Sequence, residues 1–253
     1  IPEIDVSQLM MVNIIGKGTF GDVWKATYRP RDSEEKTVAV KVLPDPKYTS
    51  TMEKEIVTLH RYGQENDHIV RLYGYVHFKG LGYVMEFMNC GSLDELMMRR
   101  RHLKYTLDHV LSYLQQIANA AGYMHSVQMV HRDLKPQNLL LCDQYRTLKL
   151  CDFGTVGNLQ TSMTNCKGSA PWMAPEVFQG KKYDAKCDVF SVGVIFWQML
   201  ARRKPYRDMN AYALLWNVCQ GKMRPNRLDC HPILQNFIER HVLVLVIIEL
   251  RRS

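Results

Sequence analysis

Three side chains suited to phosphoryl transfer lie within residues 131–138, which read His-Arg-Asp-Leu-Lys-Pro-Gln-Asn. Asp133 offers a carboxylate base for an attacking hydroxyl, Lys135 a positive charge near a moving phosphate, and Asn138 an amide oxygen for a metal ion. Asp152 opens a later Asp-Phe-Gly run and adds a second carboxylate suited to magnesium. Together these residues predict the transfer of a phosphoryl group to a hydroxyl.

A glycine-rich loop near the N-terminus is a candidate for phosphate binding. Residues 16–23 read Gly-Lys-Gly-Thr-Phe-Gly-Asp-Val, and Gly16, Gly18 and Gly21 would let backbone N–H groups approach phosphate oxygens. The signal is weak alone, because a glycine-rich hairpin can be only a turn. A dinucleotide-binding loop is followed by a helix, whereas the next segment here alternates like a strand. We therefore expect a strand–loop–strand lid over nucleotide phosphates.

Lys41 ends a Val-Ala-Val-Lys run and is the expected phosphate contact in this part of the chain. Because side chains alternate along a strand, Ala39 and Lys41 share one face and the flanking valines take the other. The alternative, a solvated lysine on an exposed face, is disfavoured by the neighbouring glycine loop. Lys41 also needs a carboxylate partner. The next predicted helix offers Glu53 and Glu55, and Glu55 is favoured because it lies one turn before Leu59.

The elements expected to position these residues fall into two parts. Residue patterns predict five strands, at residues 9–15, 22–28, 37–43, 69–77 and 82–87, and helices at residues 49–62, 107–125 and 186–200. The periodic apolar positions of the second helix are Val110, Leu111, Leu114, Ile117, Ala118 and Ala121. A small strand-rich lobe, about residues 1–86, should precede a hinge at residues 86–91 and a helical lobe at residues 92–253. Clefts between lobes are favoured ligand sites.

These motifs occur in the order and approximate spacing of the eukaryotic protein kinases. The glycine loop, Val-Ala-Val-Lys, His-Arg-Asp, Asp-Phe-Gly and an Ala-Pro-Glu run at residues 174–176 jointly resemble that family over roughly residues 9–220. The resemblance implies an α+β bilobal kinase fold, with a small antiparallel-sheet lobe carrying one helix and a larger helical lobe. It also implies ATP and Mg²⁺ as cofactors. The implied catalytic residues are Asp133, Lys135, Lys41 and Glu55, and the implied metal ligands are Asn138 and Asp152.

The same resemblance assigns residues to the adenine and to the catalytic-loop anchor. The implied adenine contacts are the side chains of Val23, Ala39 and Leu140 and the backbone of residues 86–88, which include Glu86 and Met88. Met85 resembles the gatekeeper residue beside that site. Asp188 resembles the aspartate that anchors the backbone of the catalytic loop.

Two features resemble serine/threonine kinases more than tyrosine kinases. Lys135 follows Asp133 by two positions, and Ser169 resembles a hydroxyl that bonds both of them. Residues 151–155, 160–169 and 186–191 further resemble the TGF-β-activated kinase branch of the MAP kinase kinase kinases. This likeness implies MAP kinase kinases as substrates and an activating adaptor protein.

Thr161 and Thr164 resemble the activation-loop phosphorylation sites of that branch. A phosphate there would pair with Arg132 and order the loop. For either threonine alone, a hydroxyl that merely solvates a loop is the alternative.

Composition limits the class of protein and of partner. Apolar residues make up 46% and charged residues 23% of the chain, as in ordinary globular proteins. No apolar stretch reaches the roughly 18 residues of a membrane span, and no secretory segment opens the chain. The first residue is Ile1, which favours an excised domain. Seven cysteines without a Cys-x-x-Cys pair favour a reduced, cytoplasmic protein without a zinc site.

The net charge of +8 suits an acidic partner, but it does not indicate a nucleic-acid-binding protein. The basic residues are scattered, apart from a short cluster at residues 99–104. That cluster carries no interleaved aromatic residues on which bases could stack. We expect it to be a solvated helix end.

The end of the chain departs from the family pattern. Kinases of this family would carry a cysteine–tryptophan pair, a proline and an arginine that pairs with Glu176, whereas residues 241–253 include seven consecutive aliphatic residues. This atypical tail supports an alternative class of function, a kinase-like nucleotide-binding scaffold with little turnover. A small-molecule phosphotransferase is disfavoured, because residues 169–176 resemble a platform for peptide substrates.

Overall fold

The structure is a computed structural model that describes residues 1–18, 21–31, 33–43, 45–158, 169–181, 183–206, 209–230 and 232–238. The chain divides into two compact units. Unit 1 comprises Ile1–Cys90 with Lys149–Gly154, and unit 2 comprises Gly91–Leu148 with Thr155–Ser253. The first boundary falls within the expected hinge range. The return of Lys149–Gly154 to unit 1 depends on contacts between distant segments, so sequence patterns gave no sign of it.

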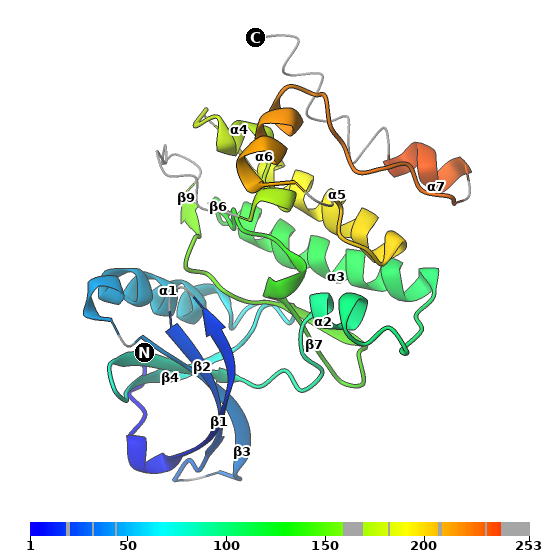
Figure 1. The fold of residues 1–253 in the computed structure, drawn as a ribbon. Helices are drawn as coiled ribbons and strands as arrows, with labels where there is room; N and C mark the ends of the chain where they lie inside the picture. Colours follow the sequence, from blue (N-terminus) through cyan, green and yellow to red (C-terminus); the bar gives the residue numbers. More distant parts are fainter. Residues whose placement is uncertain are drawn as a thin grey trace. The chain divides into compact units, whose positions relative to one another are not determined.

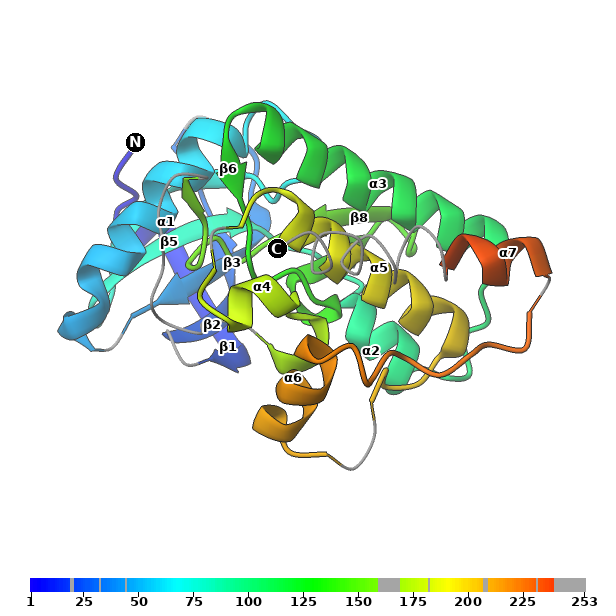
Figure 2. The same ribbon diagram turned by 90° about the horizontal axis from the view of Figure 1, so that it is seen from above.

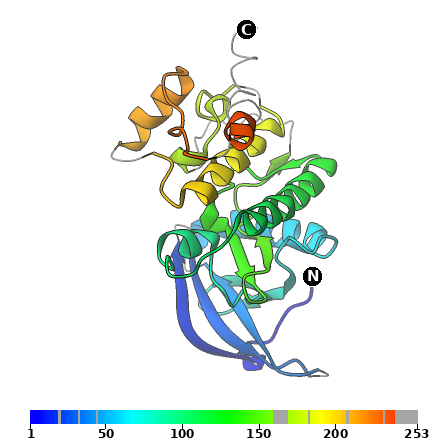
Figure 3. The same cartoon turned by 90° about the vertical axis from the view of Figure 1, so that its right-hand side faces the viewer.

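Unit 1 is built on a five-stranded antiparallel sheet in the order β1-β2-β3-β5-β4 (Figure 1). Its strands are β1 (Leu9–Gly18), β2 (Gly21–Tyr28), β3 (Lys36–Val42), β4 (Leu72–His77) and β5 (Leu81–Glu86). Figure 3 shows the blue strands of this sheet lying side by side. Val38, Val40 and Val42 of β3 belong to the apolar core cluster. Ala39 and Lys41 point to the other face and are also buried, which rules out the solvated-lysine alternative.

One helix of unit 1, α1 (Thr49–Tyr62), coincides with the predicted helix. Short 3-10 turns, η1 (Val6–Gln8) and η2 (Pro46–Tyr48), precede β1 and α1. Helix α1 contacts β4 and β5. Its buried residues are Met52, Glu55, Ile56 and Leu59. The three apolar residues are the expected core face, and a carboxylate on that face requires a polar partner.

The turn from β1 to β2 explains one of the three loop glycines. Gly21 has a φ of +131°, and a Cβ there would collide with the carbonyl oxygen of Val42 in β3. Gly16 has no such constraint, because a Cβ there would lie in ordinary contact with Val23. The close approach of β2 to β3 therefore accounts for Gly21 without any ligand. The strand that follows confirms the strand–loop–strand prediction.

Unit 2 is mainly helical. Its helices are α2 (Leu93–Met98), α3 (Leu107–Ser126), α4 (Pro175–Phe178), α5 (Lys186–Ala201), α6 (Ala211–Cys219) and α7 (Pro232–Phe237), with 3-10 turns η3 (Pro136–Asn138) and η4 (Ala170–Trp172). Short strands form two pairs, β6 (Met129–Val130) with β9 (Gly157–Asn158), and β7 (Leu139–Cys142) with β8 (Thr147–Leu150). Helix α5 is buried on most sides and runs beside α3 (Figure 2). No helix among the described residues is long and apolar enough to cross a membrane.

The predicted apolar face of α3 is partly wrong. The helix buries Val110, Tyr113, Ile117, Ala120, Ala121 and Met124. Leu111 and Ala118 are instead exposed. The buried positions follow the 3.6-residue period from Val110, and a residue one position later on a helix lies about 100° around its axis. Because several apolar side chains of α3 occupy adjacent positions, the sequence pattern is compatible with two different buried faces.

Arg202 ties three segments of unit 2 together just after α5. Its backbone is left-handed, with a φ of 46°. The guanidinium donates to the carbonyl oxygens of Leu103 at 2.9 Å and Leu96 at 3.1 Å, and it lies over the Tyr105 ring at 4.5 Å. One side chain thus joins the end of α5 to α2 and to the segment before α3.

We expect Arg202→Ala to lower the free energy of unfolding by about 2–3 kcal/mol, because two carbonyl groups lose a charged donor. Arg202→Gly loses the same bonds but removes the left-handed strain, so its loss should be smaller by about 1 kcal/mol. Urea unfolding followed by tryptophan fluorescence measures both values, with the exposed Lys204→Ala as control. Wild-type stability in both Arg202 variants would contradict this account.

Candidate active site

Lys41 and Glu55 form a buried ion pair within unit 1. The Lys41 Nζ lies 2.8 and 2.9 Å from the two carboxylate oxygens of Glu55, and the side chains are 10% and 2% exposed. β3 carries the lysine, and the buried face of α1 carries the glutamate. Glu53 is exposed on the same helix. The structure therefore selects Glu55 as the partner of Lys41.

Asp152 is a second carboxylate facing Lys41. Its Oδ1 lies 3.2 Å from the Lys41 Nζ, and its side chain is 34% exposed. Its φ is +63°, in the left-handed region that aspartate tolerates better than most residues. The next residue, Phe153, donates its backbone N–H to Oε1 of Glu55 at 3.1 Å. The Asp-Phe-Gly run is thus held to β3 by Lys41 and to α1 by Glu55.

The electrostatics of this cluster keep Lys41 charged. Burial by itself opposes the charged ammonium, yet the pKa of Lys41 is raised well above its usual value by the carboxylates of Glu55 and Asp152 around it. A cation held by carboxylates, one of them partly open to solvent, can also attract the oxygens of a phosphate. The arrangement suits an anionic ligand.

Cross-strand register brings three of the expected adenine-binding residues close to Lys41. Val23 of β2 pairs with Lys41, and Ala39 of β3 pairs with Met85 of β5. Ala39, Met85 and Met88 are 5%, 7% and 6% exposed. Unit 1 therefore offers small and apolar side chains beside the lysine.

Glu86 is more constrained than the sequence indicated. Its backbone N–H donates to the Arg71 carbonyl at 3.0 Å, so this N–H is not available to an adenine. Its carboxylate accepts bonds from the Lys149 Nζ at 2.9 Å and from the Arg71 N–H at 2.6 Å. The start of the expected hinge segment is therefore fixed within unit 1.

Asp133 is the centre of a second cluster, which lies within unit 2. Its Oδ2 accepts from the Lys135 Nζ at 2.6 Å, and its Oδ1 accepts from the backbone N–H of Ser169 at 3.1 Å. Lys135 also donates to Ser169 Oγ at 2.9 Å. Asn138 donates to the carbonyl oxygen of Asp133 at 2.9 Å. Asp133, Lys135 and Asn138 come from the run 131–138, and Ser169 comes from the segment before η4.

The contact between Ser169 and Asp133 differs from the expected one. The serine hydroxyl was expected to bond both Asp133 and Lys135, but the hydroxyl meets only Lys135 and the backbone N–H meets Asp133. Ser169 is extended and immediately precedes the 3-10 turn η4, and its backbone N–H donates to the carboxylate. Hence this half of the contact does not depend on the side chain at position 169.

Asp188 anchors the backbone of residues 131–138, here called the catalytic run, as the resemblance implied. It is fully buried, and its two oxygens accept the backbone N–H groups of Arg132 and His131, each at 2.9 Å. Arg132 has a φ of +70°, a left-handed conformation that these bonds help to hold. His125, at the end of α3, adds a third contact, with Nε2 2.9 Å from Asp188 Oδ2.

A known protein family covers most of this chain. The family described as "Protein tyrosine and serine/threonine kinase" matches residues 9–242. This chain belongs to the protein tyrosine and serine/threonine kinase family.

Three relatives show where this kinase domain stands within the family. It is 43% identical to mitogen-activated protein kinase kinase kinase mom-4 of Caenorhabditis briggsae, over 95% of this chain and 45% of that protein. It is 41% identical to mitogen-activated protein kinase kinase kinase 7 of Homo sapiens, over 88% of this chain and 36% of that protein. It is 38% identical to the Drosophila melanogaster protein of the same name, over 90% of this chain and 33% of that protein. The chain thus spans less than half the length of these relatives.

Several expected residues of the kinase domain are divided between the two units or lie outside the described residues. Leu140, an expected adenine contact, is half-buried on β7 in unit 2. Asn138 belongs to unit 2 and Asp152 to unit 1. Thr161 and Thr164 lie outside the described residues, and so do residues 241–253.

Sequence reasoning missed two polar residues of the kinase domain. His125 contacts Asp188, and Tyr83 of β5 donates its hydroxyl to Oε1 of Glu55 at 2.9 Å. Tyr83 pairs directly with Lys41 across β3 and β5. Tyr83 lies two residues before Met85, so the sequence places both on the same face of one strand. The register that aligns Tyr83 with Lys41 of the neighbouring strand is not visible in the sequence.

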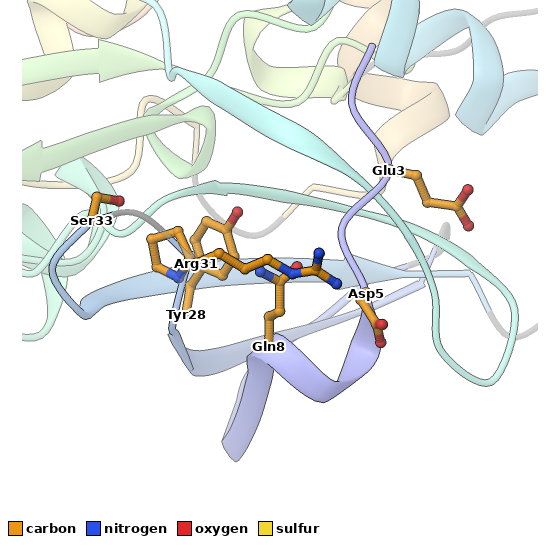
Figure 4. A pocket seen from close by; sticks show the side chains of 7 residues that line it. Glu3, Asp5, Gln8, Tyr28, Arg31 and Ser33 are labelled. Atoms are coloured by element: carbon orange, nitrogen blue, oxygen red, sulfur yellow. The ribbon is translucent and has the colours of Figure 1, made fainter.

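An open pocket elsewhere in unit 1 is not part of either cluster. Figure 4 shows it between the N-terminal segment and the turn after β2. Its lining residues are Glu3, Asp5, Gln8, Tyr28, Pro30, Arg31 and Ser33. None of them is an expected site residue, and most are exposed to solvent.

The partner of Lys41 can be tested by comparing two glutamates on one helix. We expect Glu55→Gln to lower the free energy of unfolding by about 3 kcal/mol, because the buried ammonium loses its main counter-charge. Glu53→Gln removes an exposed carboxylate of the same helix and should change stability by less than about 0.5 kcal/mol. Urea unfolding of the two variants measures both changes in the free energy of unfolding. Equal losses would show that Lys41 does not depend on Glu55.

Proposed function

We propose that this kinase domain transfers the γ-phosphate of ATP to serine and threonine hydroxyls of protein substrates, with Mg²⁺ as the metal ion. The Asp133–Lys135–Ser169 cluster carries the proposal. It places a carboxylate that can accept a hydroxyl proton beside an ammonium that can neutralise a developing phosphate charge. Catalysis of this kind depends mainly on positioning and on charge, which few residues can supply.

Asp133 would orient the attacking hydroxyl and take its proton. Its carboxylate is 9% exposed at the side chain and is fixed by Lys135 and the Ser169 N–H, so it need not reorganise when a substrate arrives. Lys135 is 20% exposed and would meet the transferring phosphate. The bond from Lys135 to the Ser169 hydroxyl ties this lysine to the segment that we expect to receive a peptide substrate.

We assign Asp152 of unit 1 and Asn138 of unit 2 to magnesium, and Lys41 to the nucleotide phosphates. Magnesium is usually held by one or two carboxylates together with substrate phosphates. Among the described residues there is no group of three or more His, Cys, Asp or Glu side chains that could hold a metal alone. Asp152 offers a partly exposed carboxylate, and Asn138 commits its amide nitrogen to Asp133, which leaves its amide oxygen as the ligand atom. When bound, Mg-ATP would supply the phosphoryl group, and its Mg²⁺ would neutralise part of the phosphate charge.

In unit 1, Lys41 would hold the nucleotide phosphates, and Glu55 would hold Lys41. We assign Gly16, Gly18 and Gly21 to phosphate approach through the backbone. For the adenine we assign Val23, Ala39, Met85, the backbone at Glu86 and Met88, and Leu140. The buried apolar residues beside Lys41 support this assignment.

MAP kinase kinases are the proposed substrates. The names of the relatives, mitogen-activated protein kinase kinase kinases, support this substrate class. We further propose an activating adaptor protein, regulatory phosphorylation at Thr161 and Thr164, and a cytoplasmic location. These proposals rest on the likeness to that branch of the family.

ATP turnover on a recombinant MAP kinase kinase tests the proposal. We expect Lys41→Met and Asp133→Asn each to lower kcat by about a thousandfold, because one loses the phosphate contact and the other the base. Asp143→Asn changes an exposed carboxylate in unit 2 and should retain wild-type turnover. Radiolabelled phosphate transfer, followed by identification of the modified residues, measures rate and hydroxyl type together.

Three outcomes would contradict the proposal. Turnover that survives both substitutions would come from a contaminating kinase. Phosphotyrosine as the main product would refute the serine/threonine assignment. A folded wild-type protein that binds Mg-ATP but shows no turnover with an adaptor present would support the scaffold alternative.

Ser169→Ala separates the two halves of its contact with the catalytic loop. The variant loses the hydroxyl that accepts from Lys135 but keeps the backbone N–H that donates to Asp133. We therefore expect kcat to fall only about threefold to tenfold, far less than for Asp133→Asn. Steady-state kinetics with a threonine peptide measures the ratio. A loss as large as that of Asp133→Asn would show that the hydroxyl acts directly on the reacting groups.

A further inference from the structure

Tyr83 touches both members of the buried ion pair in unit 1. It lies on β5, opposite Lys41 of β3, and is 1% exposed. Its hydroxyl donates to Oε1 of Glu55 at 2.9 Å, and the Lys41 Nζ lies 5.7 Å from the centre of its ring. A single side chain thus presents a donor to the carboxylate and a π face to the ammonium.

The carboxylate of Glu55 is held from three directions. Oε1 accepts from Lys41 at 2.8 Å, from Tyr83 at 2.9 Å and from the Phe153 N–H at 3.1 Å. Oε2 accepts from Lys41 at 2.9 Å. The Lys41 bonds come from the group that Glu55 has to position, and the Phe153 bond comes from the Asp-Phe-Gly segment. Tyr83 therefore gives the Glu55 carboxylate a second anchor on the central strands of the sheet, from β5 beside Lys41 of β3.

The hydroxyl stays a donor over the working pH range. Burial, and next the charge of Glu55, raise the pKa of Tyr83 well above its usual value, so the phenol remains neutral. Burial of a phenol hydroxyl without a hydrogen-bond partner would be costly. The Tyr83 hydroxyl donates to the charged carboxylate of Glu55, and a charged acceptor gives a stronger bond than a neutral one. The same position with an apolar side chain would fill the space but would remove one of the three groups that donate to the carboxylate.

We propose that Tyr83 is a positioning residue of this kinase domain, which fixes the Glu55 carboxylate so that Lys41 is aimed at the nucleotide phosphates. The proposal rests on the proposed function, in which Lys41 binds those phosphates. Tyr83 itself touches no reacting atom. It acts through Glu55, so its loss should weaken the binding of the nucleotide and should not change the binding of the protein substrate.

Tyr83→Phe tests this role, because it removes the hydroxyl and keeps the ring beside Lys41. We expect kcat/KM for ATP to fall about fivefold to tenfold, with KM for the protein substrate unchanged. The dissociation constant of the non-hydrolysable analogue AMP-PNP with Mg²⁺, measured by calorimetry, should rise by a similar factor. This second measurement needs no turnover.

Tyr105→Phe is the matched control. Tyr105 donates its hydroxyl to the Met199 carbonyl at 2.6 Å within unit 2, so the variant also loses one tyrosine hydrogen bond. Both variants should unfold at a lower temperature than the wild type, but only Tyr83→Phe should change the ATP constants. Wild-type ATP and AMP-PNP constants in Tyr83→Phe, or equal changes in both variants, would overturn the proposal.

Turnover and AMP-PNP binding report separately on the proposed function and on the role of Tyr83. A wild type without turnover would refute the function, while weaker AMP-PNP binding by Tyr83→Phe would still support the positioning role. Normal turnover together with unchanged constants in Tyr83→Phe would refute only the positioning role.

Discussion

A buried ammonium on a central strand is the constraint on which the rest of unit 1 depends. Removing a charge from water costs several kcal/mol, so Lys41 can lie beneath the surface of β3 only if opposite charges meet it there. Glu55 supplies that charge from α1, and Asp152 adds a second carboxylate from the Asp-Phe-Gly run. Strand β3, the helix α1 that follows it and the distant Asp-Phe-Gly run are thereby held to one another by the need to compensate one charge.

The catalytic run of unit 2 follows the same physical logic with the charges reversed. Asp188 is a fully buried carboxylate, and backbone N–H groups of His131 and Arg132 satisfy its oxygens. These bonds hold Arg132 in a left-handed conformation and so fix the backbone position of the next residue, Asp133. Asp133 is then held by Lys135 and by a backbone N–H, which leaves its position set before any substrate arrives. In both units, burial of a charge is what makes the geometry specific.

Much of this was predictable because local patterns carry the information. The α1 helix coincides with its predicted range, the strand after the glycine loop is present, and the order of motifs points to the family that comparison confirms. The choice of Glu55 over Glu53 also follows from helical periodicity, which puts one on the buried face and the other in solvent. Where apolar residues crowd adjacent positions, as at Leu111, periodicity alone chose the wrong side.

The sequence by itself determined which chemistry this chain carries, because the residue types and the spacing of Asp133, Lys135, Lys41 and Asp152 match those of the kinase motifs. It also determined the elements, since periods of two and 3.6 residues are properties of neighbouring positions. Only the tertiary structure decided what holds those residues. The bond from Tyr83 to Glu55, the contact of His125 with Asp188 and the backbone N–H of Ser169 on Asp133 all depend on strand register or on segments that meet across long loops. Such contacts are set by how whole elements pack, and no local pattern records them.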